Sequence, residues 1–160
     1  MMKSRLRITQ ILILIAVVTS ILNIYMALQY LEAYERVIRT QIVATLQEVD
    51  LKPEEVRITL VINIRNPVSS PFTIYRVEYD LHLNGKYMTH DSITKALEIT
   101  PNRDVMLERT VMIPPERMFT ISEAIASGEW RWKVSGAAHT TTFFGETIIR
   151  FASTMVLEPS

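Results

Sequence analysis

The segment from Ile8 to Leu28 constrains this chain most, because it is largely aliphatic and contains no charged residue. At about 1.5 Å per residue, a helix over this segment measures roughly 31 Å, the thickness of the hydrocarbon core of a bilayer. Its uncharged polar residues can bond within the helix or to a neighbouring helix. We therefore predict a membrane anchor. The anchor residues are predicted to include Ile8, Leu12, Leu14, Val18, Leu22 and Leu28.

Two other interpretations of this segment are a cleaved signal peptide and a buried helix of a soluble domain. A signal peptide has an apolar region of roughly 7–15 residues, followed by a cleavage site made of small residues. The segment here is longer, and residues 29–34 after it contain no A-x-A-like site. An uncleaved anchor is therefore the favoured interpretation.

Basic residues set the orientation that we expect for this helix. Lys3, Arg5 and Arg7 precede it without any acidic residue, whereas residues 32–39 carry two acidic and two basic side chains. An excess of Lys and Arg marks the cytoplasmic side of a membrane helix. We expect residues 1–7 to be a cytoplasmic tail and residues 8–31 to span the cell membrane once. The C-terminal domain is then extracytoplasmic.

The charge balance and the lack of cysteine exclude several classes of function. The chain has 17 basic and 17 acidic residues, so the part after the basic tail has 14 basic residues against 17 acidic ones. A mildly acidic domain lacks the basic surface with which proteins bind nucleic acid. The absence of cysteine excludes disulfides, thiolate metal sites and cysteine nucleophiles. About 130 residues follow the anchor, enough for one domain.

The helical pattern continues beyond the anchor, from Gln29 to Glu48. Apolar residues recur there at spacings of three and four, which places them on one face of a helix. We expect residues 32–52 to be an amphipathic stalk helix and linker, ended by Pro53. This face packs either on the chain's own domain or on a partner protein, and the pattern leaves both open. The stripe comprises Leu31, Tyr34, Ile38, Ile42, Leu46 and Val49, and the candidate partner contacts are Asn23, Leu31, Ile38, Ile42 and Leu46.

Between residues 53 and 157 apolar and polar residues alternate, with the period of two that is typical of half-buried strands. Asn84-Gly85 is the strongest hairpin signal, because both residues tolerate positive φ angles. A short helix is expected at 116–126, ended by Gly128. The turns between the strands favour a β-sandwich of six or seven strands. We expect these strands at 56–65, 72–83, 86–91, 95–100, 104–113, 130–142 and 146–157.

The sequence contains no motif for catalysis or for metal binding. His82, His90 and His139 lie on different expected strands without metal-ligand spacing, and no phosphate-binding or nucleophile motif occurs. His82 and His90 flank the hairpin and could face each other, with Asp80 or Asp91 as further ligands. Ordinary polar strand positions are the favoured interpretation. We therefore predict no enzymatic activity, no cofactor and no metal site.

Trp130 and Trp132 are two residues apart and share one face of a strand. In the favoured interpretation both side chains fill the core of the sandwich. In the alternative they form an exposed aromatic face that binds a glycan, a lipid headgroup or a protein. The sequence pattern alone does not choose between these two environments.

Four motifs follow one another in the expected β-region: a strand ending in NIRNP, then FTIYRVEYDLHLNGK, ITPNRDVMLERTVMIPP and GEWRWKVSGAAHTTTFFGETIIRF. Their order and spacing resemble the group-2 late embryogenesis abundant family, also called the water-stress and hypersensitive-response domain, over residues 56–154. In that family an Asn-Pro follows the first strand, as Asn66-Pro67 does, and a Leu-Asn-Gly hairpin follows the second, as at residues 83–85. From its residues alone, the Asn-Pro pair is a strand terminator rather than a ligand site, because Pro cannot continue a ladder.

The resemblance implies a seven-stranded β-sandwich with one short helix, similar in shape to immunoglobulin and fibronectin domains. It implies no known enzymatic activity, and stress protection is the usual description of the family. Membrane-anchored members with an N-terminal helix are common. The sequence departs from the family at Val68, where members often carry an Asn after the Asn-Pro. A binding edge that needs this Asn would be missing here.

Two functions fit these expectations. The first is a membrane-anchored, non-catalytic protein of the cell envelope, whose outward-facing domain has a binding, protective or structural role. The alternative is an accessory or structural subunit of a larger membrane complex or surface assembly, docked through its transmembrane and stalk helix. Membrane lipid is an expected partner in both cases, and nucleic acid in neither.

Overall fold

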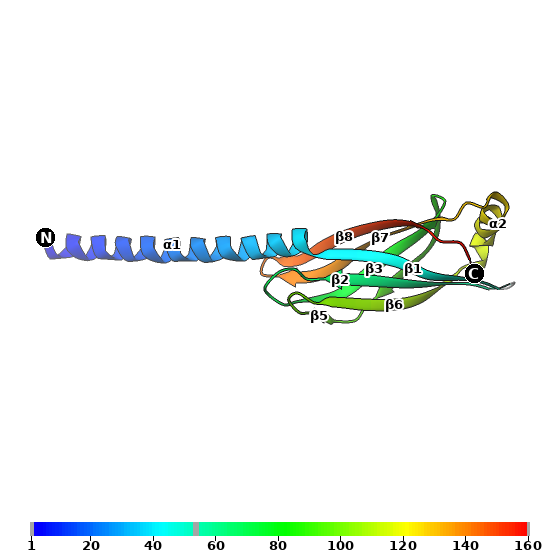
Figure 1. Ribbon diagram of the computed structural model, residues 1–160. Helices are drawn as coiled ribbons and strands as arrows, with labels where there is room; N and C mark the ends of the chain where they lie inside the picture. The colour runs from blue at the N-terminus through cyan, green and yellow to red at the C-terminus, as the bar shows by residue number, and fades with distance from the viewer. Residues whose placement is uncertain (1, 53–54, 160) are drawn as a thin grey trace.

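A computed structural model of the chain describes residues 2–52 and 55–159, with side chains described from residue 8 onward (Figure 1). Pro53, the expected end of the stalk helix, lies outside the described residues. The elements are α1 (Met2–Arg39), β1 (Gln41–Lys52), β2 (Glu55–Arg65), β3 (Phe72–Leu83), β4 (Lys86–Ile93), β5 (Leu97–Ile99), β6 (Asp104–Ile113), a 3-10 turn η1 (Pro115–Arg117), α2 (Met118–Ser127), β7 (Arg131–Thr142) and β8 (Gly145–Val156).

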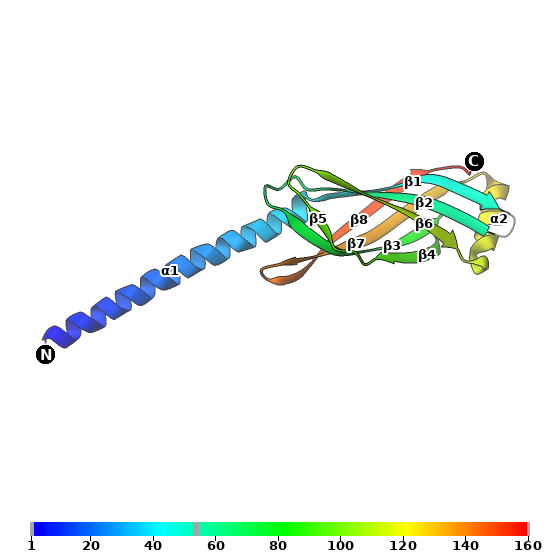
Figure 2. The ribbon, with the colours of Figure 1, turned by 90° about the horizontal axis from the view of Figure 1, so that it is seen from below.

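Helix α1 extends away from the rest of the molecule as a single rod (Figures 1 and 2). Its part from Ile8 to Arg39 is long and apolar enough to cross a membrane, and its most apolar stretch is not buried against any other part of the described chain. The aliphatic side chains from Ile8 to Leu28 therefore point outward. In water this surface would be costly, since apolar area favours an apolar environment.

The expectation of a helix as far as Glu48 is wrong beyond Arg39, because residues 41–52 form strand β1. This strand pairs antiparallel with β2, from Gln41 opposite Arg65 to Lys52 opposite Glu55. A β-bulge between Leu46 and Glu48 shifts the register. A bulge adds one residue to one strand, so the buried positions change from alternation to a spacing of three, as in a helix.

The strands form two antiparallel sheets, an arrangement consistent with a β-sandwich. One sheet has the order β1-β2-β6, and the other has the order β4-β3-β7-β8 with β5 paired to β3. The described residues therefore contain eight strands, and β1 is one that the periodicity assigned to a helix. Helix α1 leaves the domain at one end, and α2 lies at the opposite end (Figure 2). We call strands β1–β8 together with α2 the β-domain.

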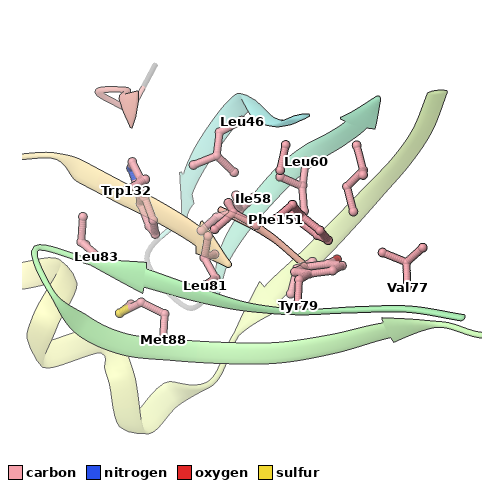
Figure 3. Close-up of a cluster of buried hydrophobic side chains, with 14 of the residues drawn as sticks. Leu46, Ile58, Leu60, Val77, Tyr79, Leu81, Leu83, Met88, Trp132 and Phe151 are labelled. Carbon is pink, nitrogen blue, oxygen red and sulfur yellow. The ribbon is translucent and has the colours of Figure 1, made fainter. Parts of the chain in front are cut away.

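The core lies between the two sheets, where side chains from both sheets meet (Figure 3). Trp132 is fully buried and Trp130 nearly so, and their rings lie 6.4 Å apart. The indole Nε1 of Trp132 donates a hydrogen bond to the carbonyl of Leu157 at 3.1 Å. The interpretation of the two tryptophans as core is confirmed, and the exposed aromatic face is wrong. Aromatic rings bury large apolar areas, which favours the inner face.

The hairpin at Asn84-Gly85 forms as expected, with φ angles of 51° and 81°. Only glycine adopts such angles freely, and asparagine tolerates them. The Asn84 side chain also ties the turn to the start of β7: its Nδ2 donates to the carbonyl of Glu129 at 2.6 Å, and its Oδ1 accepts from the Arg131 N–H at 3.0 Å. The turn therefore fixes β3 and β4 against β7.

Candidate functional site

The junction between helix and β-domain is held by polar contacts on one side of α1. Ser70 Oγ donates to Glu32 at 2.8 Å, and Arg36 donates to the same carboxylate oxygen at 3.1 Å. Arg36 also donates to the carbonyl of Thr141 at 3.4 Å, and its guanidinium lies 5.4 Å from the ring centre of Phe72. The Arg36 side chain is only 12% exposed. Charge-assisted bonds that are shielded from water are stronger than exposed ones.

No flexible linker separates α1 from the first strand. Helix α1 ends at Arg39, Thr40 is buried, and β1 begins at Gln41. The Thr40 N–H still donates to the carbonyl of Arg36 at 3.2 Å, which continues the helical bonding to the start of the strand. Because one residue connects the two elements, the direction of the helix sets the direction of the β-domain.

The residues expected to contact a partner helix divide into two groups. Asn23, Leu31 and Ile38 are exposed on α1, so they remain available. Leu46 is buried in the core of the β-domain and Ile42 is half-buried in β1, because both lie on a strand. For these two, the expectation of partner contact is wrong. The helix face that touches the β-domain is instead the half-buried one that carries Met26, Gln29, Glu32, Ala33, Arg36 and Val37.

Asn66 is a structural residue in the described fold. It is fully buried, and its Oδ1 accepts from the Val68 N–H at 2.9 Å. Its Nδ2 donates to the carbonyls of Ser70 at 3.0 Å and Ile99 at 3.1 Å. These bonds close the loop after β2 and tie it to β5, which supports the interpretation as a strand terminator. Val68, where the family often has Asn, is itself buried.

Replacing Asn66 with alanine is expected to destabilise the β-domain by about 3 kcal/mol, because buried backbone groups then lose their partners. Urea unfolding of the full chain in detergent, followed by circular dichroism, measures this loss. Asn63→Ala is the matched control: Asn63 is half-buried on β2, and its Oδ1 has no hydrogen-bond partner in the described structure. A loss for N66A no larger than that for N63A would contradict the structural role.

A cluster of charged groups surrounds His139 on β7, whose side chain is buried. His139 Nδ1 lies 2.6 Å from Glu146, and its Nε2 lies 3.0 Å from Glu78. Arg76 is also within 3.6 Å of Glu78. The contact with His139 lowers the pKa of both glutamates, and for Glu146 a contact with Tyr75 adds to this effect. Burial, followed by the contact with Glu146, raises the pKa of Tyr75.

The lowered pKa values of Glu78 and Glu146 predict a loss of stability in acid. Their contribution is fully present above the ordinary pKa of 4.5 and is lost as the pH falls through the lower folded-state values. We expect the melting temperature of the wild type to fall more steeply than that of Glu146→Gln between about pH 5 and pH 3. Glu108→Gln, at an exposed position on β6, should follow the wild type. Equal slopes for E146Q and the wild type would contradict the prediction.

An open groove of about 320 Å³ lies beside this cluster on the sheet that contains β7. Its ionisable side chains include Glu78, Asp80, His90 and Arg150, and Gly136 also lines it. His90 is 2.9 Å from Asp80, so two of these groups already pair with each other. Ser135 and His90 both line this groove, but no hydrogen bond joins their side chains in the described structure, and His90 pairs with Asp80 instead.

The two histidines beside the hairpin do not face each other. His82 lies against Tyr87, with ring centres 5.7 Å apart, whereas His90 pairs with Asp80. A bulge between Leu81 and His82 separates their registers. Among residues 2–52 and 55–159, no group of three or more His, Asp or Glu side chains is placed to hold a metal ion.

Asp91, Arg109 and Tyr79 join the two sheets along one edge of the β-domain. Arg109 on β6 donates to Asp91 on β4 at 3.0 Å, and the Tyr79 hydroxyl donates to the same oxygen at 3.0 Å. Burial raises the pKa of Tyr79. The pKa of Asp91 is lowered, because the bonds from Arg109, Ser92 and Tyr79 outweigh the opposing effect of burial. Arg109 interrupts the alternation of apolar and polar residues along β6. Its bond to Asp91 gives it a structural role.

The comparisons with known proteins agree with this architecture. Residues 61–155 match the family described as late embryogenesis abundant protein, which is more than half of the chain. The chain belongs to this family. The match begins within β2 and ends within β8, so it covers most of the β-domain and leaves out helix α1. No curated protein matches the sequence significantly.

Two solved structures share the fold of this late embryogenesis abundant domain. A solution structure of a protein from Arabidopsis thaliana has a TM-score of 0.54 and 18% identity, and covers 73% of this chain and 82% of its own. A crystal structure of a protein from Archaeoglobus fulgidus has a TM-score of 0.50 and 14% identity, and covers 74% of this chain and 96% of its own. At these identities the likeness concerns the fold alone.

Proposed function

We propose that this protein is a single-pass membrane protein that presents a non-catalytic late embryogenesis abundant domain at the cell envelope. The observation that carries this proposal is the bare apolar surface of α1 from Ile8 to Leu28, fused through Thr40 to the β-domain. A cleaved signal peptide needs no rigid connection to the mature domain. Here Glu32 and Arg36 of the same helix bond to the β-domain.

We infer that the N-terminus is cytoplasmic and the β-domain extracytoplasmic. The inference rests on Lys3, Arg5 and Arg7 before the apolar stretch. The absence of cysteine permits a direct test with two single-cysteine variants, Ser4→Cys before the apolar stretch and Ser122→Cys on an exposed position of α2. A membrane-impermeant maleimide should label S122C in intact cells and S4C only after lysis. The opposite pattern would reverse the orientation.

We further propose a binding, protective or structural role rather than catalysis. The charged groups around the 320 Å³ groove are largely paired with one another, as His139 with two glutamates and His90 with Asp80. Structural ion-pair networks lower the pKa of carboxylates in this way, as for Glu78 and Glu146, so these shifts are consistent with a non-catalytic role. Stress protection would be assayed as survival under drying or osmotic shock, comparing cells with and without the gene. Equal survival would contradict a protective role.

The finer topology proposed for the β-domain is that of immunoglobulin and fibronectin domains. Its support is the three-stranded sheet β1-β2-β6, which packs on the longer sheet β4-β3-β7-β8 with core residues from both inner faces. In this proposal β5, with three residues, is an addition to the edge of β3.

An alternative role is that of a subunit in a larger membrane complex. It is favoured by Leu31 and Ile38, which are 56% and 60% exposed on the helix beyond the apolar stretch, and by Asn23 within it. A polar side chain in a membrane helix often bonds to another helix. Under this alternative, Asn23→Leu or Ile38→Ser releases the protein from a complex that is stable in mild detergent. If the wild type and both variants elute alone from size-exclusion chromatography in mild detergent, the alternative is contradicted.

A further inference from the structure

The turn between β7 and β8 carries two exposed phenylalanines, Phe143 and Phe144, which are 56% and 50% exposed. The turn itself does not require them. Gly145 supplies the positive φ of 109°, and Thr142 Oγ1 bonds to the Phe144 N–H at 3.3 Å and to the Gly145 carbonyl at 3.2 Å. By comparison, the hairpin between β3 and β4 has the polar pair Asn84-Gly85 at its tip. The aromatic residues therefore call for an explanation outside the turn.

The β7–β8 turn extends toward the end of the β-domain from which α1 leaves (Figures 1 and 2). The ring centres of Phe143 and Tyr25 lie 6.0 Å apart, and those of Phe144 and Tyr30 lie 6.1 Å apart. Tyr30 also stacks on Tyr34 at 6.4 Å. Helix and turn together form one surface of five exposed aromatic side chains, which we call the aromatic collar.

The position of the aromatic collar along α1 places it at the edge of the membrane. Tyr25 lies about 4.5 Å before Leu28, the last residue of the uncharged stretch, and Tyr30 about 3 Å beyond it, at 1.5 Å per residue. Tyrosine and tryptophan concentrate at this depth, because their amphipathic rings suit the boundary between acyl chains and headgroups, and phenylalanine is common on the lipid-facing side of interfacial segments. Glu32 and Arg36, the polar contacts to the β-domain, follow about 6 Å and 12 Å beyond Leu28.

An apolar groove of about 420 Å³ lies between the helix and the turn, lined by Tyr30, Val37 and Phe144 among others. Tyr30 belongs to both the groove and the aromatic collar, and it lies two residues beyond Leu28, the end of the apolar stretch. Leaving this apolar surface in water costs about 25 cal/mol per Å² relative to an apolar environment.

From this placement we infer that the β7–β8 turn is a second membrane contact, with Phe143 and Phe144 seated in the interfacial lipid of the leaflet from which α1 emerges. The inference rests on the anchoring proposed above. The helix and the turn then both contact the bilayer, and Glu32 and Arg36 bond α1 to the β-domain. Together these contacts hold the domain at a fixed tilt. The groove beside Gly136 then keeps one orientation relative to the membrane surface.

Fluorescence of a tryptophan at the turn tests this inference in the full chain, reconstituted into vesicles of phosphatidylcholine and phosphatidylglycerol. Phe143→Trp is the reporter and Phe144→Trp a second one. Phe119→Trp is the matched control, because Phe119 is 71% exposed on α2 at the far end. Trp130 and Trp132 interfere little: they are buried, and Trp132 lies about 36 Å along β7 from the turn at 3.3 Å per residue.

In vesicles with lipid brominated near the headgroup end of the chain, the added indole of F143W should lose roughly half or more of its emission, as an interfacial residue would. The emission of F119W and of the wild type should stay unchanged. The inference would be overturned if the protein floats with the vesicles but the added indoles of F143W and F144W are not quenched. A blue shift of their emission without quenching would not rescue it. A protein that does not float with the vesicles would overturn the anchoring itself, and the inference with it.

Discussion

Replacing Leu14 and Val18 with arginine is expected to release the protein from the membrane. Both side chains are exposed near the middle of the apolar stretch, 63% and 56%, so no part of the β-domain shields them. Each arginine at the centre of a membrane helix costs about 2.5–3.5 kcal/mol on insertion scales, so the pair costs about 5–7 kcal/mol. The measurement is the fraction of L14R/V18R that stays with membranes after carbonate extraction, compared with the wild type.

The matched control places two arginines outside the apolar stretch, at Leu31 and Ile38. These side chains are exposed on the same helix, about 4.5 Å and 15 Å beyond Leu28. L31R/I38R should remain with the membrane fraction, because its charges lie in the headgroup region or in water. If L14R/V18R resists carbonate extraction as the wild type does, the apolar stretch does not span the bilayer.

Replacing Trp132 with alanine is expected to destabilise the β-domain by about 3–5 kcal/mol, the usual loss when a buried aromatic side chain leaves a cavity. Trp132 lies on β7 opposite Leu83 of β3 and Met155 of β8, and its indole bonds to Leu157. Since domains of this size unfold with about 5–15 kcal/mol, such a loss removes much of the total stability. Chemical denaturation in detergent, monitored by circular dichroism, gives the value.

Phe119→Ala provides the comparison for this measurement. Phe119 is a large aromatic residue too, but it is 71% exposed on α2, so its removal should change the stability by about 0.5 kcal/mol or less. The slope of the free energy with denaturant should be the same for both variants, which shows that the same surface unfolds. A W132A variant as stable as F119A would show that Trp132 does not belong to the core.

Local patterns in the sequence predicted several elements of the fold well. The strands at 72–83 and 104–113 and the hairpin at Asn84-Gly85 have the bounds that alternation and turn residues indicate. The short helix expected at 116–126 is present as η1 and α2, which ends at Ser127 before Gly128. These elements depend on neighbours in the sequence: the period of the apolar residues, and residues that accept unusual backbone angles.

Contacts between residues far apart in the sequence were not predicted. Ser70 bonds to Glu32, and Arg36 bonds to Thr141, across separations that no periodicity reveals. The pairing of Phe143 with Tyr25 was missed for the same reason. Two adjacent phenylalanines at a turn were the available signal, because turn tips are usually polar.

By itself the sequence determined that the chain has an uncharged helix of membrane length followed by a β-domain, since both depend on local composition and period. Only the tertiary structure decided that the helix ends at Arg39. In residues 41–52 the apolar side chains of Ile42, Leu46 and Val49 fit both a helix and a bulged strand. Pairing with β2 along the whole strand and burial of Leu46 and Val49 in the core favour the strand, and tertiary contacts of this kind override a weak local preference.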